Sequence, residues 1–183
     1  MNELIDFILQ VENLKEEKRK GWKLRKVKSP ESVADHSFAV TFLTLILAEN
    51  SKQKLNKQKL LELAIIHDIA ESICGDITPW DKNAKYKSEI EDSAMQELTQ
   101  HLPPKLKKKI LTLWNEYEEE KTKEAKFVKE IDRLEVFFQA YKYEKQNKGE
   151  KNLFEKFPIW KSQIKTKELK EIYNELKKKR KRN

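Results

Sequence analysis

The chain is poor in the residues that define several classes of protein. It has 3 Gly, 5 Pro and 1 Cys among 183 residues. These counts exclude collagen-like chains, disulfide-stapled scaffolds and low-complexity disorder. Cys74 has no second cysteine with which to form an internal disulfide. We therefore expect a reducing compartment and a cytoplasmic location.

A long apolar segment is also missing. The most apolar run, residues 38–48, is much shorter than the roughly 20 residues that cross a bilayer. The N-terminal residues include acids where a signal peptide has a basic stretch and then an unbroken apolar one. We expect a soluble protein with no membrane partner.

Charge of both signs is abundant. The 39 Lys and Arg residues outnumber the 31 Asp and Glu residues, which gives a net charge of +8, but the two signs are interleaved along most of the chain. Such interleaving is typical of a solvated surface. The densest basic run, residues 177–183, is interpreted as a helix end, where cations are favoured, rather than as a nucleic-acid contact. We do not expect nucleic acid to be the main partner.

The pattern of apolar residues predicts an all-α fold in a single domain. Few glycines and no alternating β-branched runs leave little room for hairpins, whereas apolar residues recur at helical spacing. Ser32 with Asp35 resembles a capping box, Asn56 is a candidate N-cap, and a Pro-Pro pair at 103–104 separates two helices. The predicted helices span residues 2–19, 33–50, 57–73, 86–101, 104–119, 122–147 and 166–180.

One predicted helix carries polar residues on a mostly apolar surface. In residues 60–72, His67 and Asp68 are adjacent, and Glu71 follows one turn later on the same side. Burial of an unpaired carboxylate costs several kcal/mol, so this group must be paired, protonated or bound to a cation. A metal ion would satisfy that requirement directly.

Further ligands are few, because the chain has only three histidines. His36 lies in the first turn of another apolar helix, His101 lies at a helix end away from the other polar residues, and Asp132 borders the apolar stripe of a third helix. Each of His36, His67, Asp68 and Asp132 alone has an ordinary structural interpretation. Together they favour a metal site of mixed nitrogen and oxygen ligands.

The order of these residues resembles the HD-domain phosphohydrolases. The chain reads His, then His-Asp about thirty residues later, then Asp about sixty-five residues after that. The flanking segments PESVADHS, HDIAESICGDITP and KEIDRLE are similar to those of the HD-domain 5′-deoxynucleotidases. The resemblance covers residues 19–143, which we take as the core of one HD domain spanning 1–183, with a helical extension at about 150–183.

The resemblance implies a helical-bundle enzyme that hydrolyses deoxyribonucleoside 5′-monophosphates. His36, His67, Asp68 and Asp132 would hold one divalent ion, which could be Mn²⁺, Co²⁺, Fe²⁺, Ni²⁺, Zn²⁺ or Mg²⁺. Glu71 and Asp76 match the catalytic acids of the family. A homodimer is also implied by the resemblance alone.

A basic segment upstream resembles the substrate-binding strip of the family. It supplies Arg19, Lys20, Trp22 and Arg25, of which a cation would hold the phosphate and the Trp would crowd the sugar. Gly21 separates Trp22 from the basic pair, whereas one form of the family pattern has Arg and Trp adjacent. The sequence therefore does not decide which cation binds the phosphate. It also leaves open that Trp22 is only a core residue and that the cations are ordinary surface charges.

Three alternative functions stay open at this point. The chain could be an HD hydrolase of another phosphorylated nucleotide. It could be a basic helical nucleic-acid-binding protein with a relic metal site, or a metal-stabilised interaction protein. Neither of the last two explains why Glu71 and Asp76 accompany the candidate ligands.

Overall fold

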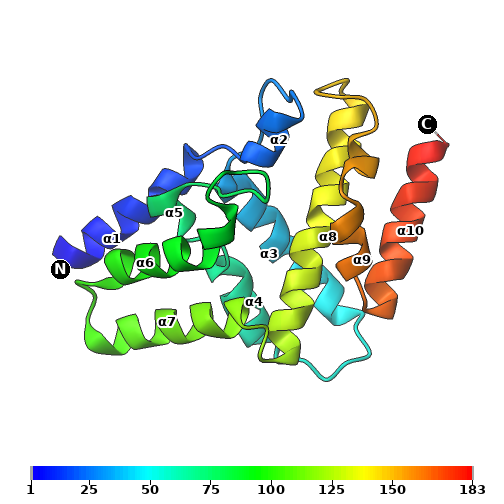
Figure 1. Ribbon diagram of the computed structural model, residues 1–183. Helices are drawn as coiled ribbons and strands as arrows, with labels where there is room; N and C mark the ends of the chain where they lie inside the picture. Colours follow the sequence, from blue (N-terminus) through cyan, green and yellow to red (C-terminus); the bar gives the residue numbers. More distant parts are fainter. Residues whose placement is uncertain (1, 183) are drawn as a thin grey trace.

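The computed structural model describes residues 2–182, and these residues form a helical bundle (Figure 1). Within that range the β-structure is limited to one isolated antiparallel bridge between Lys18 and Ser32. The all-α prediction is confirmed. None of the helices in this range is both long and apolar enough to span a bilayer.

The helices of the described residues follow one another with short connections. The α-helices are α1 (Asn2–Glu12), α2 (Lys20–Leu24), α3 (Val33–Glu49), α4 (Lys57–Ile66), α5 (Glu71–Cys74), α6 (Lys87–Thr99), α7 (Pro104–Glu118), α8 (Lys123–Lys145), α9 (Pro158–Gln163) and α10 (Lys167–Lys181). Short 3₁₀ helices are η1 (Asn13–Lys15), η2 (Ala84–Tyr86) and η3 (Leu153–Lys156).

The centre of the bundle is formed by α3, α4 and α8, which pack against one another. Figure 1 shows α1, α6 and α7 on one side of this centre and α9 and α10 on the other. Leu60 and Leu63 of α4 and Phe127, Ile131 and Leu134 of α8 are buried in the core. Removal of these apolar side chains from water is the main force that holds the three central helices together.

Local capping fixes where the central helices begin. The Ser32 hydroxyl accepts from the Asp35 backbone N–H at 3.1 Å, and the Asp35 carboxylate accepts from the Ser32 backbone N–H at 2.8 Å. The side chain of Asn56 accepts from the Lys59 backbone N–H at 3.1 Å and caps α4. Both predicted caps are confirmed. The capping box matters for function because it sets the first turn of α3, which carries His36.

The structure departs from the predicted helices in three ways. The helix predicted over 2–19 is shorter, because α1 ends at Glu12 and only the 3₁₀ helix η1 follows. The helix predicted over 57–73 is interrupted: α4 ends at Ile66, a turned segment follows, and α5 begins at Glu71. In the turn, Ile69 N–H donates to the Ile66 carbonyl and Glu71 N–H donates to the Asp68 carbonyl, so the bonds are of the tighter i→i+3 type. The short helices α2 and α9 were not predicted individually, although α9 lies within the helical extension predicted at about 150–183, because helices of five or six residues carry too little periodicity to detect.

The basic C-terminal run continues α10 through Lys181. Arg180 donates to both carboxylate oxygens of Glu144, at 2.6 and 3.2 Å, and its guanidinium lies 5.3 Å from the ring centroid of Phe154. This arginine is therefore part of the packing between α10 and α8. Asn183, the last residue of the basic run, lies outside the described residues.

Candidate metal centre and substrate cleft

Three separate parts of the bundle bring the candidate ligands together. His36 comes from the first turn of α3, His67 and Asp68 from the turn between α4 and α5, and Asp132 from the middle of α8. The ligand atoms of His36, His67 and Asp132 all lie within 4.8 Å of one another. Asp68 joins them, because its Oδ2 lies 3.0 Å from Nε2 of His67 and 3.7 Å from Nε2 of His36.

The orientation of His67 is fixed by the backbone of its own helix. Its Nδ1 is 2.8 Å from the Ala64 carbonyl oxygen, so Nδ1 carries the proton and donates it. Nε2 then presents a lone pair. That nitrogen is buried and makes no hydrogen bond, although the Asp68 carboxylate is close. A buried lone pair that faces a carboxylate oxygen is satisfied either by a proton on Nε2 or by a cation bound to both groups.

His36 is oriented in the same way by a carboxylate. Its Nδ1 is 2.8 Å from Oε2 of Glu135, and its Nε2 is 3.0 Å from Oδ1 of Asp132. Burial and the Arg19 charge favour the neutral ring, but the contacts with Asp132 and Glu135 outweigh them and raise the pKa of His36 to about 10. A proton on Nε2 would thus occupy the position that a metal ion takes in a carboxylate–histidine–metal arrangement.

The two aspartates supply the negative charge of the site. Burial raises the pKa of Asp68, but His67, His36 and Arg19 outweigh burial and hold it well below its usual range. Burial likewise opposes ionisation of Asp132, and contact with His36 and His67 holds its pKa below the usual value. Once a metal ion replaces the proton on Nε2 of His36, two ionised carboxylates and two neutral imidazoles have a charge of about −2, which a divalent ion would neutralise. The residues therefore fit a divalent metal ion.

Glu71 lies at the start of α5, beside this group. Its side chain is only 3% exposed, and its Oε2 is buried without a hydrogen-bond partner. Burial, together with the charges of Asp68 and Asp76, raises the pKa of Glu71 well above its usual range. A protonated carboxyl group with no fixed partner is suited to give a proton to a substrate atom.

Asp76 is turned toward the same region by the residue before it. Gly75 ends α5 with φ of +71°, a left-handed conformation that favours glycine. The Asp76 carboxylate then accepts from the Lys20 backbone N–H at 2.5 Å. Asp76 therefore ties the loop after α5 to the N-terminus of α2.

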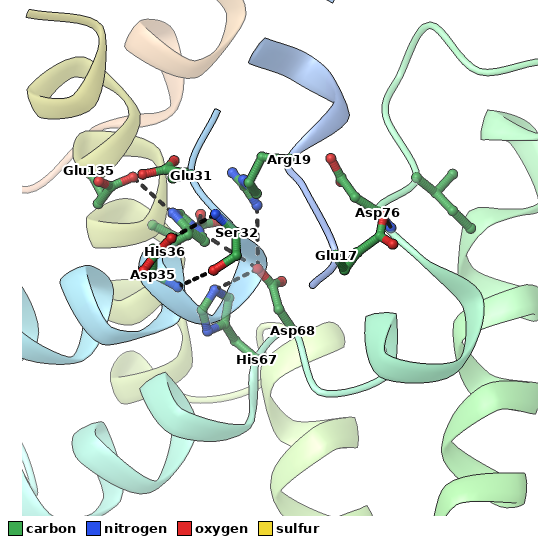
Figure 2. A network of polar contacts seen from close by, with 12 residues as sticks. Glu17, Arg19, Glu31, Ser32, Asp35, His36, His67, Asp68, Asp76 and Glu135 are labelled. Atoms are coloured by element: carbon green, nitrogen blue, oxygen red, sulfur yellow. Dashed lines mark hydrogen bonds and ion pairs between the residues drawn. The ribbon is translucent and has the colours of Figure 1, made fainter. Parts of the chain in front are cut away.

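A cleft of about 600 Å³ opens over these groups. Asp68, Glu71, Asp76 and Asp132 line it, together with five cations: Arg19 just before α2, Lys85 of η2, Lys87 of α6, and Lys129 and Arg133 of α8. Figure 2 shows that Arg19 and His67 approach the same carboxylate, that of Asp68, and the distance from Arg19 Nη1 to Asp68 Oδ2 is 3.4 Å. The cleft thus combines an acidic metal-binding end with cations that suit a phosphate group.

The predicted substrate strip is divided by the structure. Arg19 and Trp22 line the cleft, and Trp22 is 2% exposed, with its indole N–H donating to Glu31 at 2.8 Å. Lys20 instead lines a second hollow together with Cys74 and Asp81. Arg25 is outside both sets of lining residues, and its guanidinium lies 4.7 Å from the ring centroid of Trp80.

Several functional candidates were missed from the sequence. Glu135 is one turn after Asp132 on α8 and could have been noticed as a carboxylate on a buried helical face. Glu31 lies beside Glu135 in Figure 2; burial first, and then the Glu135 charge, raise the pKa of Glu31 to about 7. Lys87, Lys129 and Arg133 carried no signal, because they resemble the many other cations of the chain.

Comparisons with known proteins agree with this geometry. A family model described as "HD domain" matches residues 11–176. The 5′-deoxynucleotidase HDDC2 of Xenopus laevis is 44% identical over 146 residues, which cover 79% of this chain and 71% of that protein. The 5′-deoxynucleotidase hdd1 of Schizosaccharomyces pombe is 39% identical over 155 residues, covering 82% and 77%. A solved structure from Pyrococcus horikoshii OT3 is 36% identical, with a TM-score of 0.76, and the match covers 94% of this chain and 97% of that one.

Proposed function

This chain belongs to the HD-domain family and to its HDDC2-type 5′-deoxynucleotidases, and we propose that it hydrolyses deoxyribonucleoside 5′-monophosphates to deoxynucleosides and phosphate. The observation that carries the proposal is the convergence of His36, His67, Asp68 and Asp132 beneath a cleft. Glu71 and Arg19 border the same cleft, which adds a proton donor and a phosphate-binding cation.

The metal-binding residues support hydrolytic chemistry. A divalent ion held there would lower the pKa of a bound water and withdraw charge from the phosphoryl oxygens. The two imidazoles would hold the ion through Nε2, because their Nδ1 atoms are committed to Glu135 and Ala64. The ligand set of nitrogen and oxygen atoms suits Mn²⁺, Co²⁺, Fe²⁺, Ni²⁺, Zn²⁺ or Mg²⁺.

Arg19 and Glu71 take complementary parts in the reaction. Arg19 is held by the surrounding carboxylates, which outweigh burial and raise its pKa, so it stays charged and binds a phosphoryl oxygen. As the bond between phosphorus and the 5′ oxygen breaks, Glu71 gives its proton to that oxygen, and the deoxynucleoside leaves as an alcohol. The oxygen of the attacking water forms the new bond to phosphorus, and the proton that this water loses restores Glu71, so the products are the deoxynucleoside and hydrogen phosphate. Asp76 supports this arrangement by holding the backbone of α2, from which Trp22 projects.

The preference for deoxyribose is assigned to Trp22. Its ring lines the cleft and is held by Glu31 and by edge contacts with Tyr143 and Phe157, at centroid distances of 5.2 and 5.3 Å. An indole that is fixed on several sides cannot move aside for an additional hydroxyl. A ribose 2′-hydroxyl placed against it would be both crowded and left without a partner.

A substrate panel tests the proposal. Phosphate release should be measured with the deoxy- and ribonucleoside mono-, di- and triphosphates of one base. We expect deoxyribonucleoside monophosphates to be hydrolysed fastest. Preferred turnover of a triphosphate would favour the alternative of another HD nucleotide hydrolase. Absence of phosphate release together with salt-sensitive binding to DNA or RNA would favour the nucleic-acid alternative.

We further propose that two copies of the chain associate through α3. Residues 36–48 contain no Lys, Arg, Asp or Glu, although 38% of the chain is charged. Within this stretch of α3 the exposed side chains are all apolar and are those of Phe38, Phe42, Leu45 and Ile46. Each chain has a charge of +8, and an uncharged face lets two chains meet without like charges at the contact itself. Residues next to this face would add the area needed to reach the roughly 800 Å² that each partner buries in a standard interface.

Oligomeric state should be measured by sedimentation equilibrium. We expect a dimer that Phe42→Asp converts to a monomer. Ile8→Asp, which places the same charge on the exposed face of α1, serves as the control and should leave the dimer intact. A monomeric wild-type chain, or a dimer that Phe42→Asp leaves unchanged, would contradict the proposal that α3 forms the dimer interface.

The cytoplasmic location of the protein stays a prediction.

A further inference from the structure

The cleft has an aromatic lining that the hydrolytic chemistry does not use. Trp80, Phe157 and Trp160 line it together with Trp22. They come from the loop after α5 and from the start of α9, so the C-terminal part of the chain contributes to the cleft. None of the three can serve as a metal ligand, a proton donor to phosphate or a counter-ion.

Trp160 is held in place by a stack of rings. Its ring lies parallel to that of Phe157, with a centroid distance of 4.8 Å and an interplanar angle of 5°. Phe157 is 4% exposed and contacts the edge of Trp22. Trp160 itself is only partly buried. The stack therefore presents a preorganised aromatic surface at the cleft, which would lose little conformational entropy on binding a flat ligand.

Trp80 presents a second such surface. Its side chain is 50% exposed, although tryptophan is usually well buried. The guanidinium of Arg25 lies over the Trp80 ring. The turn that carries Trp80 is closed by Asp81, whose carboxylate accepts from both the backbone N–H and the hydroxyl of Thr78. A fixed and half-exposed tryptophan beside a cleft is typical of a binding surface.

We propose that Trp80 and Trp160 form a nucleobase subsite, on which the base of the nucleotide stacks while its phosphate lies at the metal-binding end. This inference rests on the proposed function and adds the part of the substrate that the hydrolytic groups do not touch. The cleft volume of about 600 Å³ lies within the range of sites that enclose small ligands. Stacking accepts any base, because each has a flat π-face, so the subsite favours larger purines over pyrimidines without requiring one base.

The kinetic test compares a substrate that has a base with one that lacks it. For Trp160→Ala, and separately for Trp80→Ala, kcat/KM should be measured with deoxyadenosine 5′-monophosphate and with 2-deoxyribose 5-phosphate. We expect the ratio of the first to the second to fall about tenfold, as loss of one base–aromatic stack predicts. Trp160→Phe keeps a ring and should retain most of the ratio. Ile159→Ala alters a neighbouring residue of α9 that is 69% exposed and does not line the cleft, and it should leave the ratio unchanged.

A binding test separates this inference from the proposed function. Calorimetric titration with deoxyadenosine 5′-monophosphate should show weaker binding to Trp160→Ala than to the wild type, and the loss should be smaller with deoxycytidine 5′-monophosphate. Equal loss with 2-deoxyribose 5-phosphate, or an unchanged ratio in both tryptophan variants, would overturn the subsite. If the wild type releases no phosphate from any monophosphate, the proposed function fails. The calorimetric comparison then decides the subsite on its own.

Discussion

Glu135 offers a sharp test of how the metal centre is built. Its carboxylate lies 2.8 Å from Nδ1 of His36, and both side chains are buried, with 3% and 0% exposed. The contact keeps the proton on Nδ1 and leaves Nε2 free to bind a cation. Glu135→Ala removes this partner and leaves a buried N–H without an acceptor, whereas Glu135→Gln keeps an acceptor oxygen but loses the charge.

The expected effect is on metal affinity. Loss of a carboxylate that orients a metal-binding histidine typically weakens metal binding by about 10- to 100-fold, or about 1.4–2.8 kcal/mol. We expect Glu135→Ala to reach this range and Glu135→Gln to show a smaller loss. Since all four candidate ligands are still present, excess metal should restore much of the phosphate release. The measurement is metal affinity by competition with a chromophoric chelator, followed by phosphate release as a function of metal concentration.

Glu130 provides a matched control on the same helix. It is also buried, at 8% exposed, but its carboxylate accepts from the backbone N–H groups of Lys165 and Thr166, each at 2.7 Å. Glu130→Gln should lower the melting temperature without changing metal affinity. Unchanged metal affinity in Glu135→Ala, or an equal loss in Glu130→Gln, would refute an orienting role for Glu135.

Three further predictions follow from individual contacts. Glu71→Gln should retain metal, measured as bound metal per chain, but lose about 10² or more in turnover, because the amide cannot transfer the proton; loss of metal would make Glu71 structural. Trp22→Ala should lower the free energy of unfolding by about 3–5 kcal/mol. Trp22→Phe should lower the melting temperature less, and it should reduce the ratio of kcat/KM for a deoxyribonucleotide to kcat/KM for the matching ribonucleotide. If that ratio is unchanged, the preference for deoxyribose does not come from Trp22. Burial, with the charges of Glu91 and Glu71, raises the pKa of Cys74 to about 12. At pH 8 its alkylation by iodoacetamide should therefore be about 10³-fold slower than that of free cysteine, and the rate should still rise above pH 9. Alkylation at the rate of free cysteine would contradict this prediction.

The convergence of the candidate metal ligands could be predicted from the sequence because polar groups in apolar helices are costly. His36, His67 and Asp132 each interrupt or border a run of apolar residues in a predicted helix. Such residues are few in this chain, so their order and spacing could be compared with those of a known family. The local geometry of His67 could not be predicted. Its turn depends on bonds between backbone groups after Ile66, and the sequence there continues to resemble a helix.

The substrate end of the cleft was predicted less completely. Trp22 was recognised from its neighbours in sequence, but its contact with Phe157 joins segments far apart in the chain. Trp160 lies on α9, a helix too short to show periodicity, and Lys87 is one lysine among many. Sequence patterns indicate which residues are unusual in their own segment, whereas these residues acquire a role only through tertiary packing.

Metal dependence is the most direct test of the central claim. The chain should be stripped with a chelator, shown to be free of metal, and titrated with Mn²⁺, Co²⁺, Fe²⁺, Ni²⁺, Zn²⁺ or Mg²⁺ while phosphate release from a deoxyribonucleoside monophosphate is followed. We predict no release without metal, recovery that saturates near one bound ion per chain, and no recovery at the same metal concentration in Asp132→Asn. Full phosphate release by the metal-free wild type, or full recovery in Asp132→Asn, would contradict the account.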